Sequence, residues 1–136
     1  MSKVEKKKSN FKILVIDDSP LSTNSISEIL SSEGYSAVDT SNTPSEGLQK
    51  LNVDDYHLCI LDVVMPKISG IELAKEISEG NSGACILMIS SLDSENVLIE
   101  SIASGAKDFL LKPFTESQLT STVNKLYDYA IKEKIF

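Results

Sequence analysis

The 136-residue sequence contains no tryptophan and no arginine, and it has one histidine and two cysteines. With so few nitrogen and sulfur ligands, neither a structural zinc site nor a Ser–His or Cys–His nucleophile is expected. Cys59 and Cys85 lie inside apolar runs, where free cysteines usually behave as small buried hydrophobic residues. His57 stands at the entry of a predicted strand, so a structural role is expected for it.

Long hydrophobic runs are also missing. No apolar stretch approaches the roughly 20 residues that a membrane helix needs. The opening MSKVEKKKSN is charged and lacks the apolar segment of a secretory signal. Since 41% of the residues are hydrophobic and 24% are charged, the composition is that of an ordinary globular domain. We therefore expect one soluble, cytoplasmic domain that does not contact a membrane.

The charge is predominantly of one sign, with a formal net charge of -7. From Ser9 onward, nine lysines face 19 acidic residues, because four lysines lie in the leading segment. An acidic body of this kind argues against binding to nucleic acid, whose phosphates attract basic surfaces. Residues 1–10 are predicted to be a lysine-rich, flexible tail, and residues 11–136 to be the folded domain. Its expected partners are proteins and a cation.

Five strand-like runs alternate with five helix-like segments, which is typical of an α/β protein with a doubly wound, five-stranded parallel sheet. Capping boxes are predicted at Thr43 and Thr115, and Gly34 and Gly105 suit helix ends. The predicted strands are Phe11–Ile16, Ser36–Thr40, His57–Leu61, Ala84–Ile89 and Lys107–Leu111. The last helix is expected to lay one apolar stripe on the sheet, formed by Leu119, Val123, Leu126 and Ala130.

Chemically active side chains follow four of these apolar runs. Asp17 and Asp18 follow the first, and Asp62, Ser90 and Lys112 follow the third, fourth and fifth. The carboxyl ends of parallel strands meet at one sheet edge, which is where ligands bind in such folds. Three carboxylates held close together would repel one another unless they bind a cation. Oxygen ligands with room for water favour Mg²⁺, for which Mn²⁺ should substitute.

Asp62 is the best-placed nucleophile of this set, since an aspartate can attack phosphorus and form an aspartyl phosphate. Phosphoryl transfer depends mainly on positioning and on neutralising the phosphoryl oxygens. The metal would take one oxygen, the Lys112 ammonium a second, and the Ser90 hydroxyl with nearby backbone N–H groups a third. The joint placement of these residues at strand ends carries this hypothesis.

Four motifs in this order resemble the receiver domain of response regulators, including its CheY-like single-domain form. They are DDSP at 17–20, DVVMPKISG at 62–70, ISS at 89–91 and GAKDFLLKPF at 105–114. The similarity extends from about residue 11 to about residue 132. It implies a flavodoxin-like (βα)₅ fold with strand order 2-1-3-4-5. It also implies that Asp62 accepts a phosphoryl group from a phosphohistidine on a sensor histidine kinase, as in a two-component phosphorelay.

The resemblance also implies roles for individual residues. Asp18 and Asp62 would bind Mg²⁺ together with the backbone carbonyl of Val64, while Asp17 would act mainly through a metal-bound water. Lys112 would pair with the phosphoryl group, and the Lys112-Pro113 peptide bond would be cis.

By the same resemblance, Ser90 and Phe109 are the switch pair that moves on phosphorylation. This movement would remodel the surface of the fourth helix, fifth strand and fifth helix, which binds a target protein such as a flagellar motor switch. Ser91, Val64 and Leu92 would form the phosphate and hydrolysis environment. Since Val64 and Leu92 are apolar, a partner phosphatase could set the phosphorylated lifetime. The protein would be a signalling phosphoacceptor, in chemotaxis or another pathway, and not an enzyme.

The same residues argue against two other functions. A phosphatase of the haloacid-dehalogenase type needs a second aspartate two residues after its nucleophile, and Val64 occupies that position. A nucleotide or flavin binder would need a glycine-rich phosphate loop such as GxGxxG, which the chain lacks. No output domain follows the predicted receiver in this sequence, and whether it is a fragment of a larger regulator is left open.

Overall fold

The computed structural model describes residues 7–80, 83–92 and 95–136, and within these ranges five strands alternate with five α-helices. The strands are β1 (Ile13–Ile16), β2 (Val38–Ser41), β3 (Leu58–Asp62), β4 (Cys85–Ser90) and β5 (Asp108–Leu111). The helices are α1 (Pro20–Ser32), α2 (Pro44–Val53), α3 (Gly70–Glu79), α4 (Glu95–Ala103) and α5 (Glu116–Lys132). A 3-10 helix, η1 (Lys8–Asn10), precedes β1.

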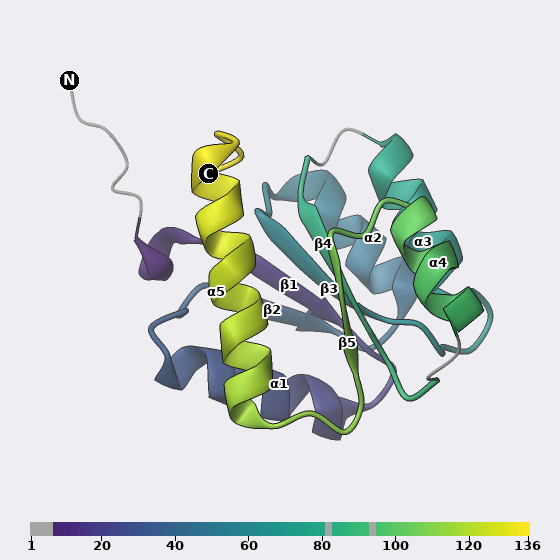
Figure 1. The fold of residues 1–136 in the computed structure, drawn as a ribbon. Helices are drawn as coiled ribbons and strands as arrows, with labels where there is room; N and C mark the ends of the chain where they lie inside the picture. Colours follow the sequence, from purple (N-terminus) through teal and green to yellow (C-terminus); the bar gives the residue numbers. More distant parts are fainter. Residues whose placement is uncertain (1–6, 81–82, 93–94) are drawn as a thin grey trace.

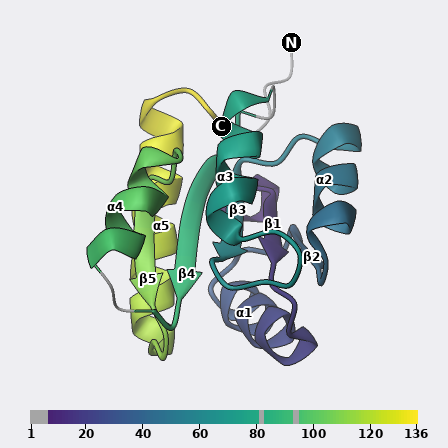
Figure 2. The same ribbon diagram turned by 90° about the vertical axis from the view of Figure 1, so that its right-hand side faces the viewer.

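All five strands are parallel and lie in the order β2-β1-β3-β4-β5. This order confirms the predicted doubly wound, flavodoxin-like sheet. Helices α1 and α5 cover one face of the sheet, and α2, α3 and α4 cover the other (Figure 1). The carboxyl ends of the strands therefore share one edge, and the arrowheads of β4 and β5 point toward it in Figure 2.

Strand boundaries differ from the sequence prediction by up to two residues. β1 begins at Ile13, and β2 runs from Val38 to Ser41, so both predicted strands began two residues too early. The reason lies in the pairing, because Ile13 pairs with Val38 in the register of these strands. Among the described strands, β2 pairs with β1 alone, so β1 sets where β2 can begin.

Two apolar cores lie on opposite faces of the sheet, because successive strand residues point to opposite sides. Ile13 and Val15 belong to the core under α1 and α5, while Leu14 and Ile16 belong to the core under α2 and α3. α5 contributes its predicted stripe to the first core, since Leu119, Val123, Leu126 and Ala130 are all buried. Every residue of β3 and β4 is buried, which explains why these strands read as continuous apolar runs.

Helix boundaries follow local chemistry. Thr115 and Gln118 form the complete capping box predicted for α5. The box predicted at Thr43 forms only in part, because the Thr43 side chain accepts from the Glu46 N–H while the Glu46 carboxylate lies 3.3 Å from Lys50 Nζ. Gly34 and Gly105 follow α1 and α4 with φ values of 99° and 113°, which favour glycine.

The histidine and the cysteines have the structural roles expected for them. His57 Nδ1 accepts a hydrogen bond from the Lys12 N–H, and its ring stacks on Phe11. Cys59 and Cys85 are both free and buried. Residues 1–6 of the predicted flexible tail lie outside the described residues. Among the helices described, none is both long and apolar enough to cross a lipid bilayer.

Candidate functional site

Three carboxylates meet at the carboxyl edge of the sheet. Asp17 and Asp18 follow β1, and Asp62 is the last residue of β3. One carboxylate oxygen from each residue lies within 4.8 Å of the other two. Asp17 is fully buried and Asp62 is 6% exposed, whereas Asp18 is exposed. Two of the three carboxylates are therefore held inside the domain, and the cluster is open to solvent on the Asp18 side.

Lys112 follows β5 and completes this cluster. Its ammonium lies 3.0 Å from Asp17 Oδ2 and 3.7 Å from Asp62 Oδ1. The Lys112-Pro113 peptide bond is cis, as expected from the resemblance. A single ammonium cannot balance three carboxylates, so the group retains an excess of negative charge that favours binding of a cation.

The surroundings of Asp62 change the pKa of its carboxyl group. Burial, followed by the nearby Asp17 carboxylate, raises the pKa of Asp62 from 3.8 to about 6. The Lys112 ammonium and the Val64 backbone N–H oppose this increase in pKa. The Asp62 carboxylate is thus costly to ionise in the metal-free protein, and an added positive charge would relieve that cost.

The donor set fits a hard divalent cation. Asp17, Asp18 and Asp62 offer oxygen atoms only, and the exposed Asp18 side leaves access for water. Mg²⁺ and Mn²⁺ prefer oxygen ligands and retain several waters, whereas zinc sites usually need His or Cys ligands. The cluster therefore fits the predicted magnesium site, while the ligand role of the Val64 carbonyl stays a prediction.

Ser90 is the last residue of β4 and is fully buried. Its Oγ accepts a hydrogen bond of 2.9 Å from the Leu92 N–H. Its carbonyl accepts a hydrogen bond of 2.7 Å from the Lys112 N–H, which ties the ends of β4 and β5 together. The hydroxyl is therefore fixed at the same sheet edge as the carboxylates.

The other predicted residues surround this edge in different environments. Val64 is 52% exposed and Leu92 is 44% exposed, and Ser91 is exposed as well. Phe109 lies in β5 and is half-buried against the core under α2 and α3. The roles of Val64, Leu92 and Ser91 around the phosphoryl group stay predictions, and so does the movement of Ser90 and Phe109.

Sequence reasoning missed the polar support behind Asp17. The Asn42 side chain donates hydrogen bonds to the Asp17 carbonyl at 2.9 Å and to Thr23 Oγ1 at 3.2 Å. The Ser19 N–H donates to Asp17 Oδ1 at 3.0 Å. Asn42 directly follows β2, so the strand-end argument used for the other residues could have identified it.

Gly70 is a second residue whose role was missed, although it lies within a motif quoted above. Its N–H donates to the Val63 carbonyl at 2.7 Å, which closes the loop after β3. A Cβ atom at this position would lie 2.0 Å from the Asp62 carbonyl oxygen. A side chain here would displace the backbone that carries Asp62, so the close approach requires glycine.

Comparisons with known proteins identify the family of this chain. Residues 13–124 match the model of the response regulator receiver domain. The chain is 31% identical over 114 residues to the chemotaxis protein CheY of Bacillus subtilis, covering 84% of this chain and 95% of that protein. It is 36% identical over 115 residues to the CpxR homolog of Haemophilus influenzae, a transcriptional regulatory protein, covering 85% of this chain and 49% of that protein.

Solved structures of response-regulator receiver domains are similar to this chain. A CheY-like receiver domain protein from Methanospirillum hungatei has a TM-score of 0.84 and 28% identity, covering 90% of this chain and 97% of that one. The chemotaxis response regulator CheY4 of Vibrio cholerae has a TM-score of 0.79 and 31% identity, covering 85% and 97% of the two chains. With its parallel five-stranded sheet and the Asp17, Asp18, Asp62 and Lys112 cluster at the sheet edge, the chain belongs to the response-regulator receiver domain family.

Proposed function

We propose that Asp62 accepts a phosphoryl group from a phosphohistidine of a sensor histidine kinase. The observation that carries this proposal is the buried Asp62 carboxylate, whose pKa is raised among Asp17, Asp18 and Lys112. In the transfer, an Asp62 oxygen bonds to phosphorus while the bond from phosphorus to the histidine nitrogen breaks. The nitrogen keeps the electron pair of that bond and takes up a proton.

Asp17, Asp18 and Asp62, with the Val64 carbonyl, would hold Mg²⁺. When bound, the ion supplies positive charge that offsets the repulsion among the carboxylates and the phosphoryl oxygens. The Lys112 ammonium is already 3.7 Å from Asp62 and would neutralise a further oxygen. The Ser90 oxygen accepts a hydrogen bond from the Leu92 N–H, so its own O–H is available to donate to a phosphoryl oxygen.

The output of this reaction is a change in protein binding. Ser90 and Phe109 would move together on phosphorylation and shift the populations of two surface states. The surface of α4, β5 and α5 suits this role because it exposes large apolar side chains, namely Leu98, Ile99, Ile102 and Leu111. The similarity to CheY proteins favours a chemotaxis target, with a flagellar motor switch among the candidates.

The labelling experiment that tests this function uses acetyl phosphate and Mg²⁺, with intact-protein mass measured over time. We expect one added phosphoryl group that is lost in Asp62→Asn and retained in Asp128→Asn, a control on the exposed face of α5. Labelling that persists in Asp62→Asn, or that does not need a divalent ion, would refute the proposal.

The decay of the label measures the phosphorylated lifetime. Val64 and Leu92 are exposed and apolar, so neither offers a polar group to orient a hydrolytic water. We therefore expect a Val64→Asn variant to lose its label at a changed rate. Decay at the wild-type rate would contradict this role for Val64.

A further inference from the structure

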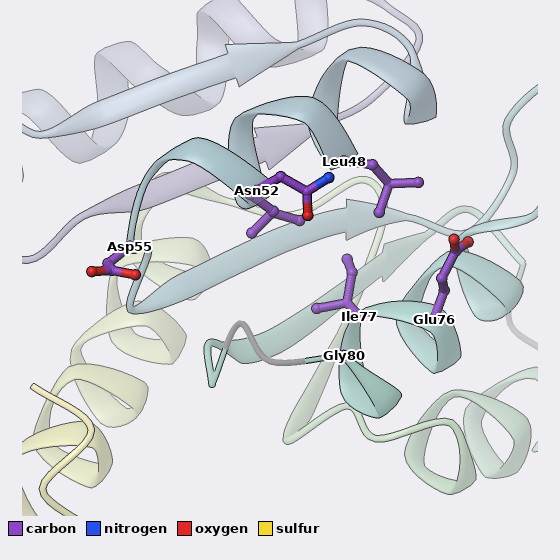
Figure 3. Close-up of a pocket in the computed structure, with 7 residues that line it drawn as sticks. Leu48, Asn52, Asp55, Glu76, Ile77 and Gly80 are labelled. Carbon is purple, nitrogen blue, oxygen red and sulfur yellow. The ribbon is translucent and has the colours of Figure 1, made fainter.

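A cavity of about 590 Å³ lies between α2 and α3, on the sheet face opposite α1 and α5. Leu48 and Leu51 from α2 and Ile77 from α3 supply its apolar surface, and Asn52 adds an amide. In Figure 3 the side chain of Leu48 extends from α2 and that of Ile77 from α3, on opposite sides of the space between the two helices. The cavity takes no part in the proposed phosphorylation site.

The rim of the cavity is negatively charged. Asp55 and Glu76 are both exposed and line the cavity, and none of the described residues lining it is basic. Figure 3 places Asp55 at one end and Glu76 at the other, with the aliphatic side chains between them. The two carboxylates are therefore arranged to receive two separate positive charges.

The cavity continues toward the carboxyl edge of the sheet. Leu48 also lines a second cavity of about 440 Å³, which is bordered by Pro44, Pro66 and Ile68 and also by Lys67 and the metal-site residue Asp18. The two cavities thus follow α2, whose ten residues span about 15 Å. Because the second cavity includes a lysine and part of the candidate metal site, we restrict the name α2–α3 groove to the first cavity. The separation of the two acidic groups on its rim suits a short peptide segment better than a single small molecule.

The chemistry of the groove decides among possible occupants. An anion or a nucleic acid would be repelled by Asp55 and Glu76. A metal ion would need carboxylates close together, and the acidic cluster found within the described residues is that of Asp17, Asp18 and Asp62. A basic segment meets both requirements, because its aliphatic side chains can fill the centre while its ammonium or guanidinium groups reach the rim.

We propose that the α2–α3 groove docks a short segment of a partner protein, in which aliphatic side chains are flanked on both sides by lysine or arginine. Charge complementarity to Asp55 and Glu76 fixes the ends of the segment, and Leu48, Leu51 and Ile77 bind its centre. This surface is separate from the face of α4, β5 and α5, so the protein can hold two partners at once.

The test uses ¹⁵N-labelled protein and an eight-residue probe peptide with two lysines, an Ala-Leu-Leu-Ala centre and two further lysines. We expect amide shifts at Leu48, Leu51, Ile77 and Gly80. Reversing both rim charges, with Asp55→Lys and Glu76→Lys in one variant, should weaken binding about tenfold or more. Replacing the two leucines of the peptide with serine should weaken binding by a similar factor, because the apolar contact is lost.

The matched control reverses the same amount of charge on the opposite sheet face, with Glu28→Lys and Asp128→Lys, both exposed. This variant should bind the peptide with nearly wild-type affinity. Equal weakening in both variants, or shifts confined to α4, would overturn the proposal. Deleting residues 1–6 tests whether the chain's own lysine-rich segment occupies the groove. A roughly tenfold gain in peptide affinity on deletion would show that it does, and would overturn the proposal that the occupant is a partner protein. Phosphoryl labelling of the groove variants should be unchanged, which separates this test from that of Asp62.

Discussion

Replacing Asp62→Asn should stabilise the metal-free protein at neutral pH. The pKa of Asp62 is about 6, compared with 3.8 for an ordinary aspartate. Each pKa unit corresponds to about 1.4 kcal/mol, so holding this carboxylate ionised costs the folded state roughly 3 kcal/mol. Asparagine has nearly the same shape and carries no charge. We expect the variant to gain roughly 1–3 kcal/mol in free energy of unfolding at pH 7.5.

The pH dependence gives this prediction a definite sign. Because the folded-state pKa of Asp62 is raised, the folded protein binds more protons than the unfolded chain between about pH 3.8 and 6. The penalty is fully present above pH 6 and disappears as the pH falls to 3.8. The stability advantage of Asp62→Asn should therefore shrink steadily over this range.

The assay is urea unfolding followed by far-ultraviolet circular dichroism, in EDTA, at several pH values between 4.5 and 7.5. Asp128→Asn serves as the control, since Asp128 is exposed on α5. Adding Mg²⁺ should stabilise wild type in proportion to its binding and should stabilise Asp62→Asn much less. A variant that is less stable than wild type at pH 7.5, or an advantage independent of pH, would refute the reasoning.

Two further predictions concern Gly70 and His57. Gly70→Ala should cost about 1–3 kcal/mol of unfolding free energy and weaken Mg²⁺ binding, because its Cβ would overlap the Asp62 carbonyl. Gly80→Ala is the control, since its nearest contact is 3.4 Å. Burial lowers the pKa of His57, so the stability provided by its neutral ring is lost as pH falls below about 6.5. His57→Asn, which keeps an acceptor for the Lys12 N–H, should flatten that loss in urea titrations; an unchanged slope would contradict this role.

The strand pattern made much of this site predictable. Asp17, Asp62, Ser90 and Lys112 were identified because each stands at the end of an apolar run, and parallel strands bring such ends together. The prediction of the site depended on where the strands end and on their parallel arrangement. Errors of two residues at the start of β1 and β2 therefore left it unchanged.

Other features could not be predicted because they depend on distances between segments. The position of Asn42 after β2 could have been noticed in the sequence, but its bonds join the end of β2 to the Asp17 carbonyl after β1 and to Thr23 in α1, and no spacing in the sequence encodes these partners. The incomplete capping box at Thr43 is a local effect instead, since the Glu46 carboxylate lies 3.3 Å from Lys50 Nζ, one turn along the helix, and this pairing competes with the box. The α2–α3 groove was not predicted because its two walls are about 25 residues apart in the chain and meet only in the folded domain.

Helix α4 is attached to the domain much more weakly than α5. Ser101 is the one residue of α4 buried within the described chain, whereas α5 buries four apolar side chains. Opening α4 alone would expose little additional apolar surface, so it should cost far less than unfolding the whole domain. Backbone amides of α4 should therefore exchange with deuterium through local opening, while those of α5 exchange only when the first core comes apart.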